Sequence, residues 1–457
     1  MPAPSTALHR LTAAEAAALI AARELSPVDL VGSLLARIEA TEPALRAWEV
    51  VDAERALAAA RAAEEAVDRA VRAGGRPSVP LLGIPFGVKD VIDVAGLPTG
   101  CGFEPFRARP AETDAGAVAR LRGAGAIVLG KTATTQFAFR DPPPTRNPWR
   151  EDRSPGGSST GSAVAVAAGH VPFALGTQTS GSVLRPAAFN GVVGFKPTFG
   201  RVGRRGVFPA AWSLDHVGVL ARSVEDCRLF LAAAEGPDAG DPASTSPAAG
   251  PRGAGAALPP RLGLLTAALD GSSAEVREHV TDAARRLEAA GARVEEVGSL
   301  PSLELAEAIQ QVTMQCEMAD LHRRLRRLHP DSYRPHLRAY LDVGAQLPGW
   351  AYVHAQRLRR RLALEMGRAL DRHHALLLPT CVGVAPPVAA GTGDASLQAP
   401  FTLLGLPALS LPAPPGREGL PLAVQLVGRR GDDLGLLAVA AWCEERLPRP
   451  GPPPGLD

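Results

Sequence analysis

The stretch SPGGSSTGSAVAVAAGHVPFALGTQTSGSVLRP, residues 154–186, alternates small-residue turns with apolar runs. Glycines and serines as dense as those of 154–162 let a backbone approach a ligand closely. The apolar run that follows argues against a flexible linker. The second turn, 176–186, follows the strand-like FALG and can direct several backbone N–H groups at one point. A helix and a returning strand fit between Ser158 and Ser182, so we expect both serines at one edge of a sheet.

Lysine is rare in this chain. Lys and Arg together number 49, yet only Lys89, Lys131 and Lys196 are lysines. Arginine stays protonated in proteins, whereas a buried lysine can lose its proton. A retained lysine is therefore a candidate for a role that arginine cannot fill; the alternative is chance survival with tight packing around a smaller head group. Lys89 ends the strand-like run GIPFGVK, and strand ends are where α/β folds place chemistry.

The composition excludes several classes of protein. The 457 residues are 46% hydrophobic and 21% charged, which is typical of a globular chain long enough for one large α/β enzyme. A formal net charge of +2 excludes a strongly basic or acidic binding protein. The aromatic content of 4% argues against a stacking platform for single-stranded nucleic acid.

Cysteines and hydropathy indicate the compartment. No CxxC pair occurs, so neither a zinc ribbon nor a redox pair is indicated. The N-terminal segment lacks the uncharged core of a signal peptide, and the long uncharged stretches are broken by Gly and Pro. We predict a cytoplasmic protein without a membrane span. The sparse cysteines, which suit a reducing compartment, are Cys101, Cys227, Cys316, Cys381 and Cys443.

The hydrophobic pattern divides the chain into segments within one domain, 1–457. Helical spacing runs through the beginning, with Ser26 and Pro27 starting a helix. From about residue 80, apolar runs alternate with Gly/Pro turns and helical stretches, which predicts an α/β domain. The expected segments are N-terminal helices 1–70, a catalytic core 75–235, a low-complexity loop 236–260, a helical cap 303–372 and the C-terminal part of the core 373–447.

Two familiar motifs are decoys. Residues 125–132 match the phosphate-binding pattern GxxxxGK[ST], but the four intervening residues read as a strand rather than a loop. The pattern GxSxG is absent, so the nucleophile elbow of the α/β-hydrolases does not apply. Of the ten histidines only His170 falls near the serine loops, in an apolar stretch, so a Ser-His-Asp triad has no obvious base. Two or three serines with one lysine remain.

Across nearly its whole length the sequence resembles the amidase signature family. The resemblance implies a large α/β/α fold with a central mixed twisted β-sheet covered by helices. It also implies amide-bond hydrolysis that needs no metal and no organic cofactor. The motifs that carry it are GIPFGVKDVIDVAGLPT (83–99), GKTATTQFAF (130–139), NPWREDRSPGGSSTGSAVAVAAG (147–169), ALGTQTSGSVLRPAAFNGVVGFKPTFGRV (174–202) and GLPLAVQLVGRRGDDLGLL (419–437).

The resemblance assigns the catalytic residues. The family's base lysine falls on Lys89, its bridging serine, which follows a cis peptide bond, on Ser158, and its nucleophile on Ser182. Backbone amides of Thr179, Ser180, Gly181 and Ser182 would form the oxyanion hole. Further candidates are the supporting residues Ser159, Gln178 and Arg185 and the pocket residues Cys101 and Phe103.

This chain departs from the family beside the nucleophile. Gln178 stands where the family usually has Asp, and Ser180 where it has Gly or Ala. The family's Arg, two residues after the nucleophile, is Leu184 here, and Arg185 follows it. We hypothesise one altered ion pair beside Ser182. Phe103 stands where Ser is common.

The resemblance implies a stand-alone serine hydrolase. The bond cleaved would be a carboxamide or a related bond: an anilide, carbamate, urea or ester. Buried Lys89 would be the base of a relay through Ser158 to Ser182, leading to an acyl-enzyme. We expect the 303–372 helices, with Trp350 and Tyr352, to cap the pocket. The expected partner is a small-molecule substrate, with no nucleic acid and no membrane, in a monomer or homodimer.

Other functions stay open at this point. One is the glutaminase component of a tRNA-dependent amidotransferase, although the stretch usual in that component is replaced here by VTMQCEMADLHRRLRRLHP. Another is nucleic-acid binding through the arginine clusters 323–327 and 357–361, against which the small net charge argues. A nucleotide hydrolase built on 125–132 is the third.

Overall fold

The computed structural model describes residues 8–75, 79–244, 259–298 and 300–456. Within these residues the strands are β1 Trp48–Val51, β2 Pro85–Lys89, β3 Ile127–Thr132, β4 Phe173–Gln178, β5 Val193–Lys196, β6 His216–Ala221, β7 Arg261–Leu265, β8 Arg293–Val297, β9 Ala375–Pro379, β10 Ala408–Pro415 and β11 Pro421–Val427. The α-helices are α1 Ala13–Ala21, α2 Pro27–Leu45, α3 Ala53–Arg72, α4 Gly116–Gly123, α5 Thr160–Ala167, α6 Leu184–Asn190, α7 Val224–Ala234, α8 Ala267–Asp270, α9 Ala274–Ala289, α10 Ala306–Leu328, α11 Pro335–Gln346, α12 Gly349–Leu370, α13 Ala399–Leu403 and α14 Asp433–Glu444.

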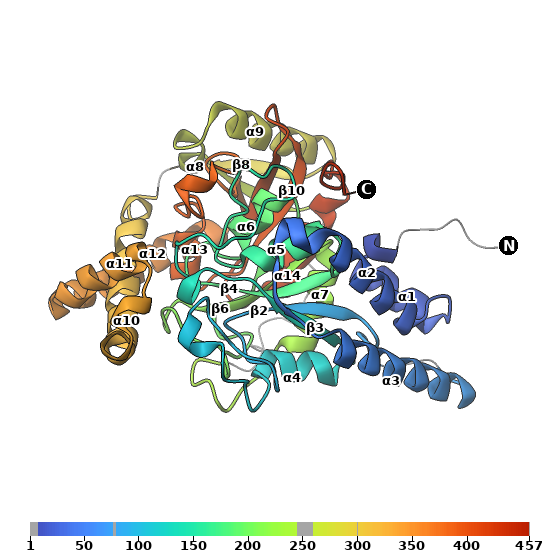
Figure 1. The fold of residues 1–457 in the computed structure, drawn as a ribbon. Coiled ribbons are helices and arrows are strands. Elements are labelled where there is room, and N and C mark those ends of the chain that lie inside the picture. Colours follow the sequence, from blue (N-terminus) through green and yellow to red (C-terminus); the bar gives the residue numbers. More distant parts are fainter. Residues whose placement is uncertain (1–7, 76–78, 245–258, 299, 457) are drawn as a thin grey trace.

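All these strands join one mixed sheet in the order β1-β3-β2-β4-β6-β5-β10-β11-β9-β7-β8. β2 pairs in parallel with β3 and β4, and β7 pairs in parallel with β8 and β9. The other pairs are antiparallel. The inner strands β2, β3, β4 and β6 are buried along their whole length, as strands covered on both faces are. The expected α/β fold with a central mixed sheet is confirmed (Figure 1).

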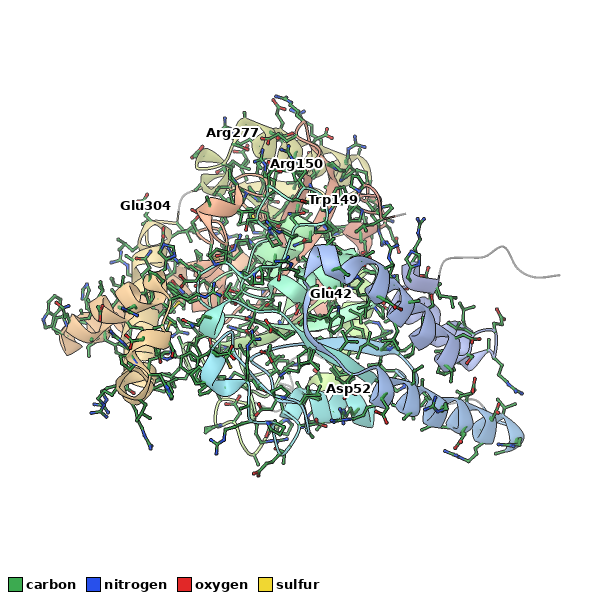
Figure 2. All side chains as sticks on the ribbon, viewed as in Figure 1. Glu42, Asp52, Trp149, Arg150, Arg277 and Glu304 are labelled. Carbon is green, nitrogen blue, oxygen red and sulfur yellow. The ribbon has the colours of Figure 1, made fainter. Side chains whose placement is uncertain are left out.

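Local sequence signals set several helix boundaries. The Ser26 hydroxyl accepts hydrogen bonds from the backbone N–H groups of Val28 and Asp29, and Pro27 occupies the first position of α2, as expected. Near the C-terminus, the Asp432 side chain caps α14. Side chains fill the layers between these helices and the sheet (Figure 2).

The N-terminal segment is not wholly helical. Strand β1 interrupts it and pairs antiparallel with β3 at the edge of the sheet. Its sequence, WEVV, is aromatic and β-branched, a composition that favours a half-buried strand over a helix. In the phosphate-loop decoy, Ile127–Thr132 is strand β3, so the loop of a nucleotide site does not form there. Of the expected loop 236–260, residues 245–258 lie outside the described part of the chain.

The helices α10, α11 and α12 gather on the side of the molecule away from α1, α2 and α3 (Figure 1). The three helices pack on one another, and α10 also contacts α13 of the C-terminal half. No helix in the described residues is both long and apolar enough to cross a membrane.

The sheet brings the candidate residues together. β2 and β4 lie side by side in parallel, with Val88 opposite Leu175, so both strands end at the same edge. Phe86 and Phe173 stack across the pair with ring centroids 5.4 Å apart. Burial of each ring contributes about 1.5–3 kcal/mol to holding the strands together. Lys89 ends β2, α5 precedes β4, and Ser182 follows β4, just before α6.

Candidate active site

Lys89 lies in the interior and faces hydroxyl groups. Its Nζ is 2.7 Å from Ser158 Oγ and 2.7 Å from Thr177 Oγ1, and the side chain is fully buried. Of the described residues, no carboxylate forms an ion pair with Lys89. Burial lowers the pKa of Lys89 to about 7, against a weaker opposing effect of the Asp215 carboxylate. Near neutral pH this amine can therefore be unprotonated and accept a proton.

Ser158 is held in a tightly packed turn. The peptide bond between Gly157 and Ser158 is cis, as the family resemblance implied. Gly156 has a φ of +73°, and a Cβ there would lie 2.8 Å from Cα of Pro186 at the start of α6, so the turn requires glycine. The turn therefore packs directly against the helix that follows Ser182.

Ser159 joins the serine turn to β4. Its hydroxyl donates to the Thr177 carbonyl at 3.2 Å and accepts from the Thr177 N–H at 3.2 Å. Because Thr177 contacts Lys89, this pair of bonds fixes the position of the strand beside the lysine. Ser159 thus supports the site without lining the pocket.

Ser182 lies in a turn whose carbonyl groups are all anchored. The Thr179 carbonyl accepts from Gln310 Nε2 at 3.3 Å, and the Ser180 carbonyl accepts from Thr402 Oγ1 at 2.7 Å. Among the described residues none accepts a hydrogen bond from the backbone N–H groups of Ser180, Gly181 or Ser182. These donors are available for a negatively charged oxygen. A Cβ at Gly181 would meet Gln398 Oε1 at 2.3 Å, so no larger residue fits this turn.

Gln178 replaces an ionic partner with a neutral cap. Its Oε1 accepts from the N–H groups of Val183 and Leu184 at 2.8 and 3.0 Å, and its Nε2 donates to Thr402 Oγ1 at 2.9 Å. The side chain therefore satisfies otherwise unpaired donors at the start of α6. It is fully buried.

Arg185 turns away from Gln178. Its Nη2 donates to the Gly157 carbonyl at 2.7 Å and its Nη1 to the Gly393 carbonyl at 2.6 Å. The hypothesis of one altered ion pair beside Ser182 is wrong, because Gln178 and Arg185 bind different groups and neither pairs with the other. The extra methylene of Gln relative to Asp lets its amide reach the helix N–H groups directly.

A buried carboxylate supports the other side of the turn. Asp215 accepts from Thr179 Oγ1 at 2.5 Å and from the N–H groups of Ala210 and Ala211 at 2.8 and 3.0 Å. Burial raises the pKa of Asp215 to about 6, and these hydrogen bonds oppose the rise. Thr179 is thereby tied to β6 and its preceding loop.

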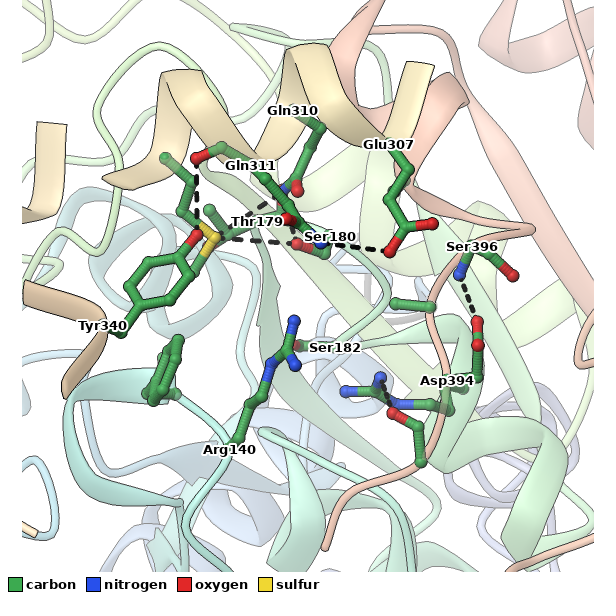
Figure 3. A pocket seen from close by; sticks show the side chains of 17 residues that line it. Arg140, Thr179, Ser180, Ser182, Glu307, Gln310, Gln311, Tyr340, Asp394 and Ser396 are labelled. Carbon is green, nitrogen blue, oxygen red and sulfur yellow. Dashed lines mark hydrogen bonds between the residues drawn. The ribbon is translucent and has the colours of Figure 1, made fainter. Parts of the chain in front are cut away.

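A pocket of about 120 Å³ opens onto Ser182. Figure 3 shows Glu307, Gln310 and Gln311 on α10 above it and Arg140 pointing in from the other side. Gln310 Nε2 also bonds Ser180 Oγ, so α10 is attached to the turn that carries the nucleophile candidate. The residues that line the pocket include Phe139, Arg140, Thr179, Ser180, Ser182, Arg185, Glu307, Gln310, Met314, Tyr340 and Asp394.

Four expected pocket residues lie elsewhere. Cys101 and Phe103 are fully buried and are absent from the described lining of the pocket; Phe103 packs in an aromatic cluster that includes Phe137 at 4.8 Å between centroids. Trp350 is 73% exposed, and Tyr352 donates to Glu317. Helices α10 and α11 contribute to the pocket instead, because their N-terminal and central parts lie closer to the turn at Ser182.

The other two lysines serve structure. Lys131 Nζ lies 2.9 Å from Asp90 Oδ1 and donates to the Pro98 carbonyl at 2.8 Å. Lys196 donates to the carbonyls of Pro197 and Leu406, and burial lowers its pKa to about 7. Neither faces a serine hydroxyl.

Several site residues were not predicted from sequence. Thr177 could have been found, because parallel pairing of β2 and β4 puts it beside Lys89. Asp215, Gln310 and Arg140 reach the site through tertiary packing, and no local sequence pattern marks them.

Comparison with known proteins identifies the family. The Amidase family model matches residues 29–437. The glutaminase-type component of the glutamyl-tRNA(Gln) amidotransferase of Roseiflexus castenholzii is 38% identical, with 95% of each chain covered. Among solved structures, a vestigial protein complex related to the origins of an s-triazine catabolic enzyme has a TM-score of 0.87 at 32% identity, covering 96% of this chain and 99% of that one. The peptide amidase of Stenotrophomonas maltophilia has a TM-score of 0.83 at 32% identity, covering 98% and 99%.

These relatives also correct one expectation. We predicted a small-molecule substrate as the sole partner, no nucleic acid, and a monomer or homodimer. The curated relatives are named as components of an amidotransferase that acts on a tRNA, and this finding contradicts that prediction. The fold, the match over residues 29–437 and the relatives together show that the chain belongs to the Amidase family of amidase signature enzymes.

Proposed function

We propose that this chain hydrolyses a small carboxamide through an acyl-enzyme, with Ser182 as nucleophile, Ser158 as proton relay and Lys89 as base, and that it does so without a partner. The single observation that carries the proposal is the contact of fully buried Lys89 with Ser158, in the absence of a described counter-ion. A lysine paired with a carboxylate would stay charged and could not accept a proton.

The protons move in one direction and then return. Neutral Lys89 takes the proton of Ser158 while Ser158 takes that of Ser182, whose Oγ attacks the amide carbon. The C–N bond breaks as the relay returns a proton to the leaving amine. Water then attacks the acyl-enzyme, losing its proton to the same relay, and releases the carboxylic acid.

The turn that bears Ser182 supplies the electrostatic part of catalysis. The free N–H groups of Ser180, Gly181 and Ser182 would donate to the oxygen that becomes negatively charged in the transition state. Asp215, Gln310 and Thr402 hold this turn through its side chain and carbonyls. The donors are thus in place before the substrate arrives, which lowers the cost of reorganisation during the reaction.

The test compares hydrolysis of a primary amide, an anilide, an aryl ester and an aryl carbamate by the purified chain and by Ser182→Ala and Lys89→Met. Substrate classes in this panel would be ranked by kcat/KM. We expect at least one to be turned over by the wild type and lost in both variants. Full activity in Ser182→Ala would exclude this serine as the nucleophile.

A second candidate is the glutaminase component of a tRNA-dependent amidotransferase. The observation in its favour is that the curated relatives bear the name of such a component over nearly the whole chain. In this case the chain would act on glutamine in a complex with partner proteins and charged tRNA. Glutaminase activity would be measured for the chain alone and with the remaining amidotransferase components of the R. castenholzii relative. Activity that depends on those components favours the second candidate.

A further inference from the structure

The pocket contains a buried guanidinium without a counter-ion. Arg185 lies in the first turn of α6, is 6% exposed and lines the pocket together with Ser182. Its Nη atoms donate to the carbonyls of Gly157 and Gly393 and to Thr392 Oγ1 at 3.2 Å. Its Nε is buried and has no hydrogen-bond partner in the described structure. Every partner of this cation is therefore neutral.

Such burial is costly unless a charge compensates it. Burial lowers the pKa of Arg185 to about 10, so the side chain still carries its charge at neutral pH. A buried charge that lacks a counter-ion is strongly destabilising, and proteins ordinarily pair it. No carboxylate of the described residues forms an ion pair with Arg185. The space left for a negative charge is the pocket itself.

A second guanidinium points into the same space. Arg140 follows Phe139, lies over its ring at 5.8 Å and projects toward Ser182 in Figure 3. The two acidic residues of the pocket are exposed and already accept hydrogen bonds: Glu307 from Gln311 Nε2, and Asp394 from the N–H of Ser396. The positive charges thus lie next to the nucleophile, and the negative charges lie at exposed positions.

We propose that the substrate of this site carries a carboxylate that binds Arg185 and Arg140, a few bonds from the scissile carbonyl. The inference rests on the proposed hydrolysis at Ser182. Ser182 and Arg185 are three residues apart at the start of one helix, about one helical turn, or roughly 5 Å. In a pocket of about 120 Å³ this spacing fits a monoamide of a short dicarboxylic acid.

The test uses monoamides of linear dicarboxylic acids with one, two and three carbons between the carbonyl groups. Each is measured beside the neutral primary amide of the same length. We expect the best-fitting acid to exceed its neutral match in kcat/KM by at least about tenfold, because a charge-assisted hydrogen bond contributes more than a neutral one. In Arg185→Met this ratio should fall toward one, mainly through KM. Arg140→Met should lower it less.

The matched control is Arg324→Met, which removes an exposed arginine of α10 that is not among the described lining residues. It should keep the wild-type ratio. Equal loss of activity on neutral and anionic amides in Arg185→Met would show that Arg185 only holds the Gly157 carbonyl, and would overturn the inference. A wild-type preference for neutral amides would overturn it as well.

A binding measurement separates this inference from the proposed function. Ser182→Ala is titrated calorimetrically with linear dicarboxylates and with monocarboxylates of equal length. We expect the dicarboxylate to bind at least about tenfold more tightly, with the difference lost when Arg185→Met is added. Failure of all hydrolysis with this binding intact would reject the proposed chemistry alone. Equal binding of both acids would reject the carboxylate site even if neutral amides are hydrolysed.

Discussion

Lys89 and Lys131 are the same residue type on neighbouring strands, and both are fully buried. Lys131 pairs with Asp90 at 2.9 Å and donates to a carbonyl and to a threonine hydroxyl. Lys89, one step away in register, contacts Ser158 and Thr177. The comparison teaches that burial alone does not make a lysine a base. The difference is whether a carboxylate accompanies it into the interior.

The largest expected effect is on catalysis at Lys89. Lys89→Met keeps the apolar stem and removes the amine, so kcat should fall by about 10²–10⁴-fold, the usual contribution of general acid–base catalysis. Steady-state hydrolysis of the best substrate in the panel measures it. Lys131→Met, assayed at a temperature where it stays folded, is the matched control and should retain far more activity. Equal losses in the two variants would remove the distinction between these lysines.

The next effect is on stability and has the opposite pattern. Lys131→Met leaves Asp90 buried without its partner, which should cost about 3–5 kcal/mol of unfolding free energy. Lys89→Met removes a buried amine that has no counter-ion and should cost less or be stabilising at neutral pH. Urea unfolding of both variants measures the two values. A larger loss in Lys89→Met than in Lys131→Met would contradict the assignment of roles.

The pH dependence of stability gives a smaller but cleaner signal. The pKa of Lys89 is lowered by burial to about 7, below the 10.5 of an exposed lysine, so between these values the unfolded chain binds more protons than the native chain. Stability from Lys89 is therefore lost as pH falls from about 10.5 to about 7. The variant Lys89→Met should reduce this slope by up to about 1.4 kcal/mol per pH unit. An unchanged slope would mean that Lys89 keeps an ordinary pKa.

The smallest change tests the hydroxyl at Thr177. Thr177→Val keeps the shape and removes an acceptor for the charged amine, so the pKa of Lys89 should fall further. The acidic limb of the kcat/KM profile should move below pH 7, with the plateau rate reduced only modestly. Ser162→Ala, which removes a hydroxyl that bonds Thr132 and the Leu175 carbonyl without touching Lys89, serves as control and should leave the limb in place.

Much of the site could be predicted because its parts lie in short contiguous motifs. The turns at 154–162 and 176–186 and the end of β2 carry Ser158, Ser182 and Lys89, and the strand–helix–strand order between them follows from local hydrophobic pattern. The rarity of lysine also drew attention to the correct residue type. It could not distinguish Lys89 from Lys131, because the carboxylate that separates them, Asp90, acts through a side-chain contact across two strands.

The remainder depends on tertiary packing. Gln310 reaches the nucleophile turn from a helix more than a hundred residues later in the chain, and Asp215 does so from the loop before β6. The replacement of Asp by Gln178 suggested a lost ion pair, but only the structure shows that the longer side chain caps α6. Trp350 was expected at the pocket for its size, whereas helix packing leaves it exposed.

The central claim is that a neutral Lys89 activates Ser182 through Ser158. The most direct measurement is the rate at which an alkyl fluorophosphonate labels the chain as a function of pH, followed by intact mass and peptide mapping, because it needs no knowledge of the substrate. The account predicts a single label on Ser182, with a rate that rises through pH about 7 to a plateau and loses this rise in Lys89→Met. A label on another residue, or the same pH profile in wild type and Lys89→Met, would contradict it.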